Sequence, residues 1–187
     1  MEVVSVNVAR VRALERRGRT LRTGLWKLPV AGPVAVGELG LDGDFQGDRR
    51  VHGGPDKAVY AYALEDLGWW EDELGRALGP GFFGENVTLR GVDVNGGRVG
   101  ERWQVGTAVL ELTGPRGPCW KLQAKVGEPR FVKRFAEAGR PGAYLRVLRA
   151  GKVEAGDAVR VVASPGDAPT VATLAGGREG RRPADRA

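Results

Sequence analysis

The decapeptide TGPRGPCWKL, residues 113–122, contains Cys119, the only cysteine among the 187 residues of the chain. The alternating apolar run at 109–113 predicts a strand, and the prolines and glycines that follow end it and predict a stiff turn. Arg116 and Lys121 flank the cysteine, and nearby cations favour the thiolate, the form that attacks electrophiles and binds metals. Most free cysteines are small buried hydrophobic residues instead, and this stretch alone leaves both interpretations open.

The composition predicts one soluble globular domain. Hydrophobic residues make up 42% of the chain, which is long enough to bury a substantial core, and no run approaches the roughly 18 apolar residues of a membrane helix. No signal peptide is recognised at the start, and a single cysteine forms no internal disulfide. We therefore expect a cytoplasmic protein without a membrane partner. We expect a single domain over residues 1–163 and a partly disordered tail, rich in proline, glycine and arginine, over 164–187.

The formal net charge of +6 permits a phosphate-bearing partner such as nucleic acid. Much of the excess, however, lies in arginines near the two ends, six of them within residues 10–22 and four within 178–186. Such arginines more often solvate a surface than form a site. Specific nucleic-acid binding is therefore not expected, and non-specific binding should be weak and sensitive to salt.

Short strands separated by glycine-rich turns predict a mainly β fold with some α-helix, namely a β-barrel-like core with helices packed on its outside. Strands are expected at 4–8, 26–30, 58–63, 86–89, 98–105, 108–113, 143–148, 152–154 and 158–162, and residues 9–24 are expected to form a loop or an irregular hairpin. The clearest helix is expected at 64–78, where five apolar residues share one face. A second helix is expected at 129–138, before Gly139.

A polar, glycine-rich stretch at 43–58 is the first candidate for a binding segment. It contains the only histidine, His52, close in sequence to Asp56 and Lys57. Glycines there would let the backbone approach a ligand and offer N–H groups to an anion. A lone histidine is more often structural, so the chemistry of His52 is one of two open interpretations.

Two further polar stretches adjoin predicted strands, at 81–88 and 139–146. Glu85 and Asn86 lie at the start of a strand, where they would either cap a turn or exchange hydrogen bonds with the edge of a heterocycle. Arg146 alternates with apolar neighbours, so it faces the opposite side of its strand and is a candidate for a polar site.

Several standard catalytic schemes do not fit the chain. It has no P-loop and no GxGxxG sequence before a predicted helix, and one histidine with one cysteine is too few for a usual zinc site. Cys119 and His52 are a possible nucleophilic dyad, but their spacing does not show that they meet.

Taken together, four motifs in this order resemble the MOSC domain family, which is also found at the C-terminus of molybdenum-cofactor sulfurases. They are GD at 43–44 with Asp48 and HGGPDKAV at 52–59, FGENVT at 83–88, PRGPCWKL at 115–122, and GRPG at 139–142 with Tyr144 and Arg146. The likeness runs from about residue 3 to residue 162. Within this family, the chain is similar to the stand-alone bacterial branch associated with resistance to N-hydroxylated base analogues.

The resemblance implies a β-barrel-rich fold with an open cleft, and a cysteine that binds molybdenum cofactor (molybdopterin) or carries sulfur. Cys119 would be the molybdenum ligand, and Cys119 and His52 are the expected catalytic residues. The residues expected to line the pterin, to hold its phosphate or otherwise to bind the cofactor are Asn86, Glu85, Thr88, Arg116, Lys57, Lys27 and Arg146.

By the same resemblance the chain would reduce small N-hydroxylated substrates, such as hydroxylaminopurine bases, with electrons from a separate flavin or iron–sulfur protein. It lacks the cysteines for a cluster of its own and any nucleotide fingerprint, so no resident flavin, cluster or pyridoxal phosphate is expected. Two alternatives stay open. One is a sulfur carrier that takes a persulfide on Cys119 from a partner desulfurase, and the other is a non-catalytic module that binds nucleic acid or the cofactor.

Overall fold

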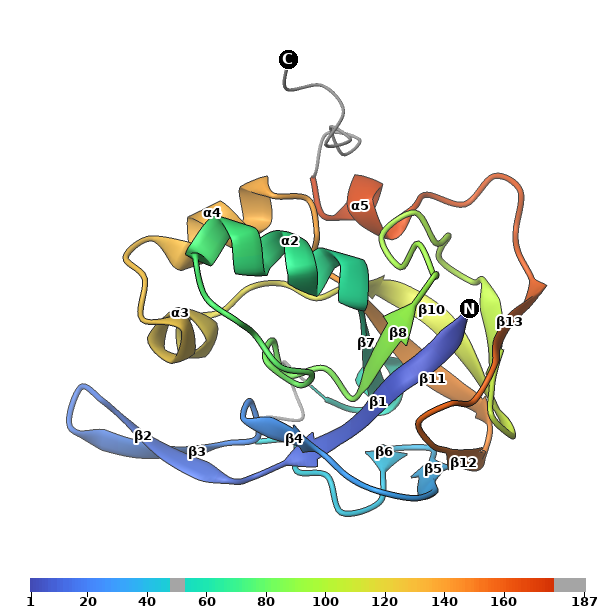
Figure 1. The fold of residues 1–187 in the computed structure, drawn as a ribbon, viewed down its shortest axis with the longest axis horizontal. Helices are drawn as coiled ribbons and strands as arrows, with labels where there is room; N and C mark the ends of the chain where they lie inside the picture. Colours follow the sequence, from blue (N-terminus) through green and yellow to red (C-terminus); the bar gives the residue numbers. More distant parts are fainter. Residues whose placement is uncertain (48–52, 177–187) are drawn as a thin grey trace.

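The computed structural model describes residues 1–47 and 53–176, and within them the chain is mainly β with four α-helices (Figure 1). The strands are β1 (Glu2–Ala9), β2 (Arg12–Arg16), β3 (Arg19–Thr23), β4 (Lys27–Pro29), β5 (Val34–Gly37), β6 (Gly40–Leu41), β7 (Val59–Ala63), β8 (Val87–Arg90), β9 (Arg102–Val105), β10 (Ala108–Pro115), β11 (Ala143–Arg149), β12 (Gly151–Val153) and β13 (Val159–Ala163). The helices are η1 (Pro55–Lys57, a 3₁₀ turn), α2 (Leu64–Leu74), α3 (Trp120–Val126), α4 (Phe131–Glu137) and α5 (Val171–Leu174). The predicted fold class is confirmed.

The main sheet closes on itself as a barrel. Its strand order is β13-β9-β10-β11-β7-β8-β1-β4, and β7 and β8 pair in parallel, while the other neighbours are antiparallel. The start of β1 bonds back toward β13, because the Val159 N–H donates to Met1 O (3.0 Å) and the Val3 N–H donates to Asp157 O (2.8 Å). These bonds and the bridge between Glu2 and Ala158 join β13, at one end of the strand order, to β1, next to the other end, and so close the barrel.

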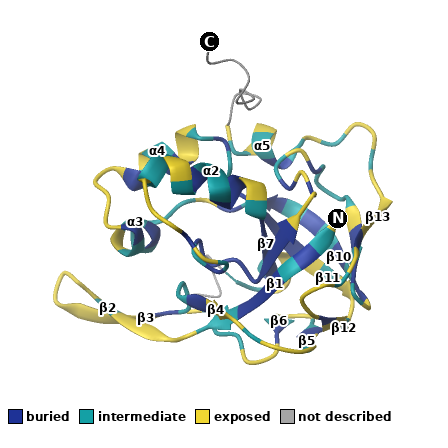
Figure 2. Ribbon diagram, viewed as in Figure 1, coloured by how far each residue is buried: buried dark blue, intermediate teal, exposed yellow. Residues whose placement is uncertain are grey.

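Strand β7 separates two hydrophobic cores. Val59 and Ala61 belong to the cluster inside the barrel, whereas Tyr60 and Tyr62 belong to an aromatic cluster under the helices. Trp70 of α2 is fully buried in that second cluster. Every residue of β7 is buried (Figure 2). Because a strand alternates its side chains between two faces, β7 fixes α2, α3 and α4 against the outside of the barrel.

One expected helix needs correction, and one helix of the structure was not expected from the sequence. The helix expected at 64–78 ends at Leu74, because Gly75 adopts a left-handed conformation (φ 63°) and its N–H bonds back to Glu71 O. The apolar pattern misled beyond this point, since Leu78 is buried in the same cluster without being helical. Helix α3 was not predicted, because its seven residues bury only Leu122 and Val126 and are too few to show a helical stripe.

Part of the expected tail packs against the folded domain. Val171 of α5 is fully buried, and its N–H donates to Gly97 O (2.9 Å). Residues 177–187 lie outside the described residues, so disorder there stays a prediction. None of the helices in the described part of the chain is both long and apolar enough to span a membrane.

Candidate functional site

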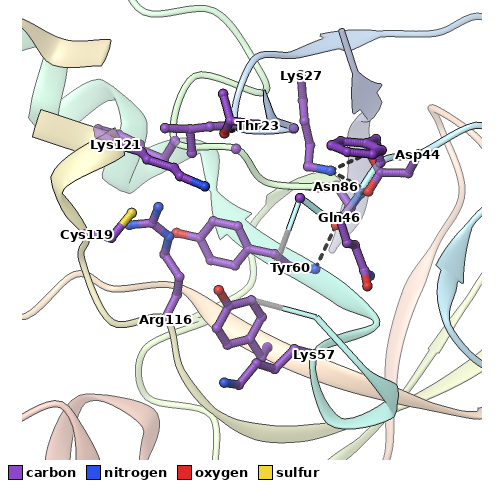
Figure 3. Close-up of a pocket in the computed structure, with 17 residues that line it drawn as sticks. Thr23, Lys27, Asp44, Gln46, Lys57, Tyr60, Asn86, Arg116, Cys119 and Lys121 are labelled. Atoms are coloured by element: carbon purple, nitrogen blue, oxygen red, sulfur yellow. Dashed lines mark hydrogen bonds and ion pairs between the residues drawn. The ribbon is translucent and has the colours of Figure 1, made fainter. Parts of the chain in front are cut away.

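A pocket lies where the turn before α3 meets β7 and the loop after β6 (Figure 3). Its lining comes from segments far apart in the sequence, namely 23–27, 44–47, 57–60, 83–86 and 116–121, together with Tyr144 of β11. Each of the polar stretches singled out in the sequence contributes at least one residue. The barrel and its helices therefore bring these stretches to one place.

Cys119 is held on the pocket wall by the end of β10 and the start of α3. It is the N-cap residue of α3, with an extended backbone (φ −133°, ψ 165°), and its carbonyl accepts a hydrogen bond from the Leu122 N–H at 3.0 Å. Leu122 is fully buried in the aromatic cluster and anchors the helix. The cysteine is half-buried and packs against that cluster while lining the pocket. This location is compatible with both interpretations of the sequence, and the role of Cys119 as a site residue stays a prediction.

Arg116 is a buried cation close to Cys119. It is only 4% exposed, and its Nη1 has no hydrogen-bond partner among the described residues. The guanidinium lies 5.7 Å from the ring centroid of Tyr60 and 5.8 Å from that of Phe135. Burial raises the pKa values of Tyr60 and Tyr144, so these phenols stay neutral and do not balance the charge. A buried guanidinium with an unused donor indicates a place for an anionic partner.

Lys27, Asp44 and Asn86 form a buried network on the other side of the pocket (Figure 3). Lys27 Nζ donates to Asp44 Oδ1 (2.5 Å), and Asn86 Nδ2 donates to Asp44 Oδ2 (2.8 Å). Asn86 Oδ1 accepts from the Tyr60 N–H (3.1 Å). Burial lowers the pKa of Lys27, and the ion pair with Asp44 opposes that shift. Both Lys27 and Asn86 line the pocket, but the protein itself uses most of their hydrogen-bonding capacity.

Three of the residues expected to bind a cofactor do not line this pocket. Glu85 and Thr88 are fully buried, and Thr88 Oγ1 donates to Glu85 Oε1 (3.0 Å). Arg146 is on the exposed surface, 3.3 Å from Asp56 in an ion pair. It shares a strand face with Tyr144, which does line the pocket, but it lies two residues further along β11. Any effect of these three residues on a ligand here would be indirect.

His52 lies outside the described residues, so its meeting with Cys119 stays a prediction. Tyr60, Tyr144 and Gln46 line the pocket but were not proposed as site residues from the sequence. The tyrosines were missed because an apolar run reads as core. The alternation of tyrosine with small residues in VYAYA, residues 59–63, was the signal that two different faces are buried there.

The lining is positively charged. Among the described residues that line the pocket, one has a carboxylate, Asp44, and four have cationic side chains, namely Lys27, Lys57, Arg116 and Lys121. Clustered cations in a recess raise the local concentration of anions and favour charge-assisted hydrogen bonds to them. The pocket is therefore suited to an anionic ligand.

Lys125 ties α3 to the loops behind the pocket. Its Nζ donates to Leu25 O (3.1 Å) and to Gly81 O (3.3 Å), and it lies over the rings of Trp26 and Phe82. Burial lowers the pKa of Lys125 to about 8, although Glu85 opposes the shift. The helix that follows Cys119 is thus held by a lysine whose charge is costly to bury.

Replacing Lys125 by methionine is expected to change how stability depends on pH. A lysine in an unfolded chain titrates near 10.4, whereas the folded-state pKa of Lys125 is about 8. Between these values the unfolded state binds more protons, so this group makes the unfolding free energy rise with pH. The unfolding free energy of wild type minus that of Lys125→Met, measured in urea titrations, should rise by about 1–3 kcal/mol from pH 7.5 to 10.

Lys133→Met, at an exposed lysine of α4, controls for the loss of a charge. A free-energy difference between wild type and Lys125→Met that does not change with pH would contradict the expectation.

Comparison with known proteins points to one family. A model of the MOSC domain matches residues 48–160. The chain is 37% identical to the uncharacterized protein YflK of Bacillus subtilis over 154 residues, which cover 82% of this chain and 70% of YflK. It is 30% identical over 157 residues to a protein named reductase from Gibberella moniliformis, covering 79% of this chain but only 27% of that protein. The crystal structure of YiiM from Geobacillus stearothermophilus superposes with a TM-score of 0.76 at 34% identity, covering 93% of this chain and 81% of that one.

Proposed function

Because the chain belongs to the MOSC domain family, we propose that it is an oxidoreductase that binds molybdenum cofactor in this pocket and reduces N-hydroxylated compounds. Cys119 would be the protein ligand of the metal. The observation that carries the proposal is Arg116, a buried cation with an unused donor that lines the same pocket as the only cysteine. A core arginine without such a role would be expected to have a partner for each buried N–H.

The chemistry of the donor set fits the cofactor. In the described part of the chain, no three side chains among His, Cys, Asp and Glu lie close enough together to hold a metal ion. A metal placed at Cys119 would therefore need further donors of its own, as a chelated metal has, and the Cys119 thiolate would add one anionic sulfur ligand to them. Arg116, Lys57 and Lys121 would bind the anionic groups of the cofactor, while the Lys27–Asp44 pair is already internally neutralised.

The reaction would convert R–NHOH, two electrons and two protons into R–NH₂ and water. When bound, the cofactor supplies the metal centre that passes the electrons. The chain's residues would fix the cofactor through Cys119 and Arg116 and orient the substrate beside them. The Lys57 and Lys121 ammonium groups line the pocket and are the candidate proton donors to the leaving hydroxyl. The electrons would come from a separate protein.

A sulfur carrier is the second candidate. The same geometry favours it, because Arg116 would also stabilise the anion of a persulfide on Cys119. The two functions differ in what the purified protein should hold.

Protein produced in a host that makes molybdenum cofactor should contain close to one molybdenum per chain. It should also reduce a hydroxylaminopurine when an artificial donor supplies electrons. Metal content by mass spectrometry and turnover by chromatography test both statements, with protein from a cofactor-deficient host as the control. A labile extra sulfur without molybdenum would favour the sulfur carrier. The absence of both molybdenum and turnover would contradict the reductase.

A further inference from the structure

The hairpin of β2 and β3 carries an unusual concentration of positive charge. Residues 10–22 contain six arginines and a single acidic residue, Glu15. All six arginines are exposed. Arg16 and Arg19 stand directly opposite each other across the hairpin, a like-charge pair that costs stability in an isolated sheet. A negatively charged partner bound at the hairpin would offset this repulsion.

This hairpin is also separate from the rest of the sheet. It forms a two-stranded sheet of its own and extends away from the barrel below α3 (Figure 1). A two-stranded hairpin alone is marginally stable in water. Leu14 and Leu21 pair across its strands, and Leu21 is 38% exposed. An apolar centre with a charged rim is the composition of a protein–protein interface.

Three arginines fix the hairpin next to the pocket. Arg12 lies over the ring of Trp26 (5.4 Å to the centroid) and Arg16 over that of Trp120 (4.4 Å). Arg22 lies over Phe45, a pocket residue, at 5.1 Å. These contacts use the aromatic faces that a nucleic acid would need for stacking its bases. The remaining arginines, including Arg17 and Arg19 at the turn, make no ion pair with the described residues.

The positive surface leads directly to Cys119. The chain runs from the end of β3 into Thr23, Gly24 and Leu25, which line the pocket. At the other side Arg16 contacts Trp120, the residue next to Cys119. A protein bound to the hairpin would therefore sit at the edge of the pocket, within reach of whatever Cys119 holds.

We propose that the β2–β3 hairpin is the docking surface for an electron-carrier protein with an acidic surface around its redox centre. The inference rests on the proposed reductase function, because only a redox enzyme needs such a partner. Transient redox complexes bury little area, and opposite charges speed and orient their encounter. In each turnover, two molecules of a one-electron carrier would each be oxidised by one electron, and the substrate R–NHOH would take both electrons with two protons to give R–NH₂ and water.

The test replaces the turn arginines in the cofactor-loaded full chain. Arg17→Asp combined with Arg19→Glu reverses two charges, and Arg19→Glu also removes the repulsion with Arg16. The matched control is Lys152→Glu with Arg160→Glu, which makes the same change in net charge at exposed positions of β12 and β13, on the other side of the barrel in Figure 1. The probe is an acidic flavodoxin, and a small artificial donor serves as the comparison.

The hairpin variant should weaken flavodoxin binding by about tenfold or more in calorimetry at low salt, and should raise the KM for flavodoxin by a similar factor. Turnover with the artificial donor should stay within about twofold of wild type, and the control variant should behave as wild type in both measurements. Unchanged flavodoxin binding in the hairpin variant, or an equal loss in the control variant, would overturn the proposal. So would tight binding of single-stranded DNA at physiological salt that is lost in the hairpin variant while flavodoxin binding is kept. If wild type shows no turnover with the artificial donor, the reductase function fails, and the calorimetry still decides the docking surface.

Discussion

Replacing Cys119 by serine is expected to reduce turnover of an N-hydroxylated purine to background while leaving the fold intact. The serine hydroxyl is nearly isosteric with the thiol, but it ionises far less readily than a cysteine thiol, whose free pKa is about 8.5. The variant should therefore keep the turn before α3 and lose the anionic ligand that we propose for the metal. Cys119 is half-buried rather than sealed in a core, so the unfolding free energy should change by no more than about 0.5 kcal/mol.

Three measurements on one sample of Cys119→Ser separate this outcome from its opposite. Thermal midpoint, molybdenum per chain and turnover with an artificial donor should show a normal midpoint, lost or labile metal, and no activity. If the cysteine were only a filler of the aromatic cluster, an unpartnered hydroxyl would cost roughly 1–3 kcal/mol of stability. Activity per folded molecule would then be intact. A destabilised variant with full turnover per folded molecule would remove Cys119 from the active site.

The sequence predicted the barrel because its signals are local. Alternating apolar residues and glycine turns are properties of short segments, and β1, β7, β10 and β11 follow them closely. Helix α3 was missed because its stability comes from burying Leu122 and Val126 in a cluster built by distant residues. The end of α2 was misplaced for the opposite reason. A local stop at Gly75 overrode an apolar pattern that continues to Leu78.

The site was predictable as a set of segments but not as a set of contacts. Cys119 and Arg116 lie three residues apart, so their shared pocket could be expected from the sequence. Whether a buried polar residue faces a pocket or supports its wall depends on partners far away in the chain. Asn86, for example, lies on the pocket and spends its amide on Asp44 and on the backbone of β7. Glu85, its neighbour, points the other way into the protein.

Replacing Glu85 by alanine is expected to give the largest loss of stability among single changes near the pocket. The carboxylate is completely buried and accepts from the N–H groups of Gly81 (2.6 Å) and Phe83 (3.0 Å) and from the hydroxyl of Thr88 (3.0 Å). Alanine would leave all three donors without an acceptor, and each such buried donor costs about 1–3 kcal/mol. We expect the unfolding free energy in urea to fall by about 3–5 kcal/mol. The pocket residues Phe83 and Gly84 should then lose their fixed position.

Glu85→Gln separates the role of the hydrogen bonds from that of the charge. Burial raises the pKa of Glu85, and its hydrogen bonds to the backbone and to Thr88 only partly oppose the shift. The charged form is therefore costly to bury. Between the unfolded-state pKa, about 4.3, and the higher folded-state value, the folded chain binds more protons, so this group makes stability fall as pH rises. Glutamine removes that cost and that pH dependence. Its amide N–H₂, however, places a donor where the carboxylate offered an acceptor.

The glutamine variant should be less destabilised than the alanine variant at pH 7. The control Glu128→Ala, at an exposed position, should have a stability close to that of wild type. Equal stability of Glu85→Ala and wild type would show that the turn at 81–84 is held by other contacts, and that Glu85 has no part in shaping the pocket.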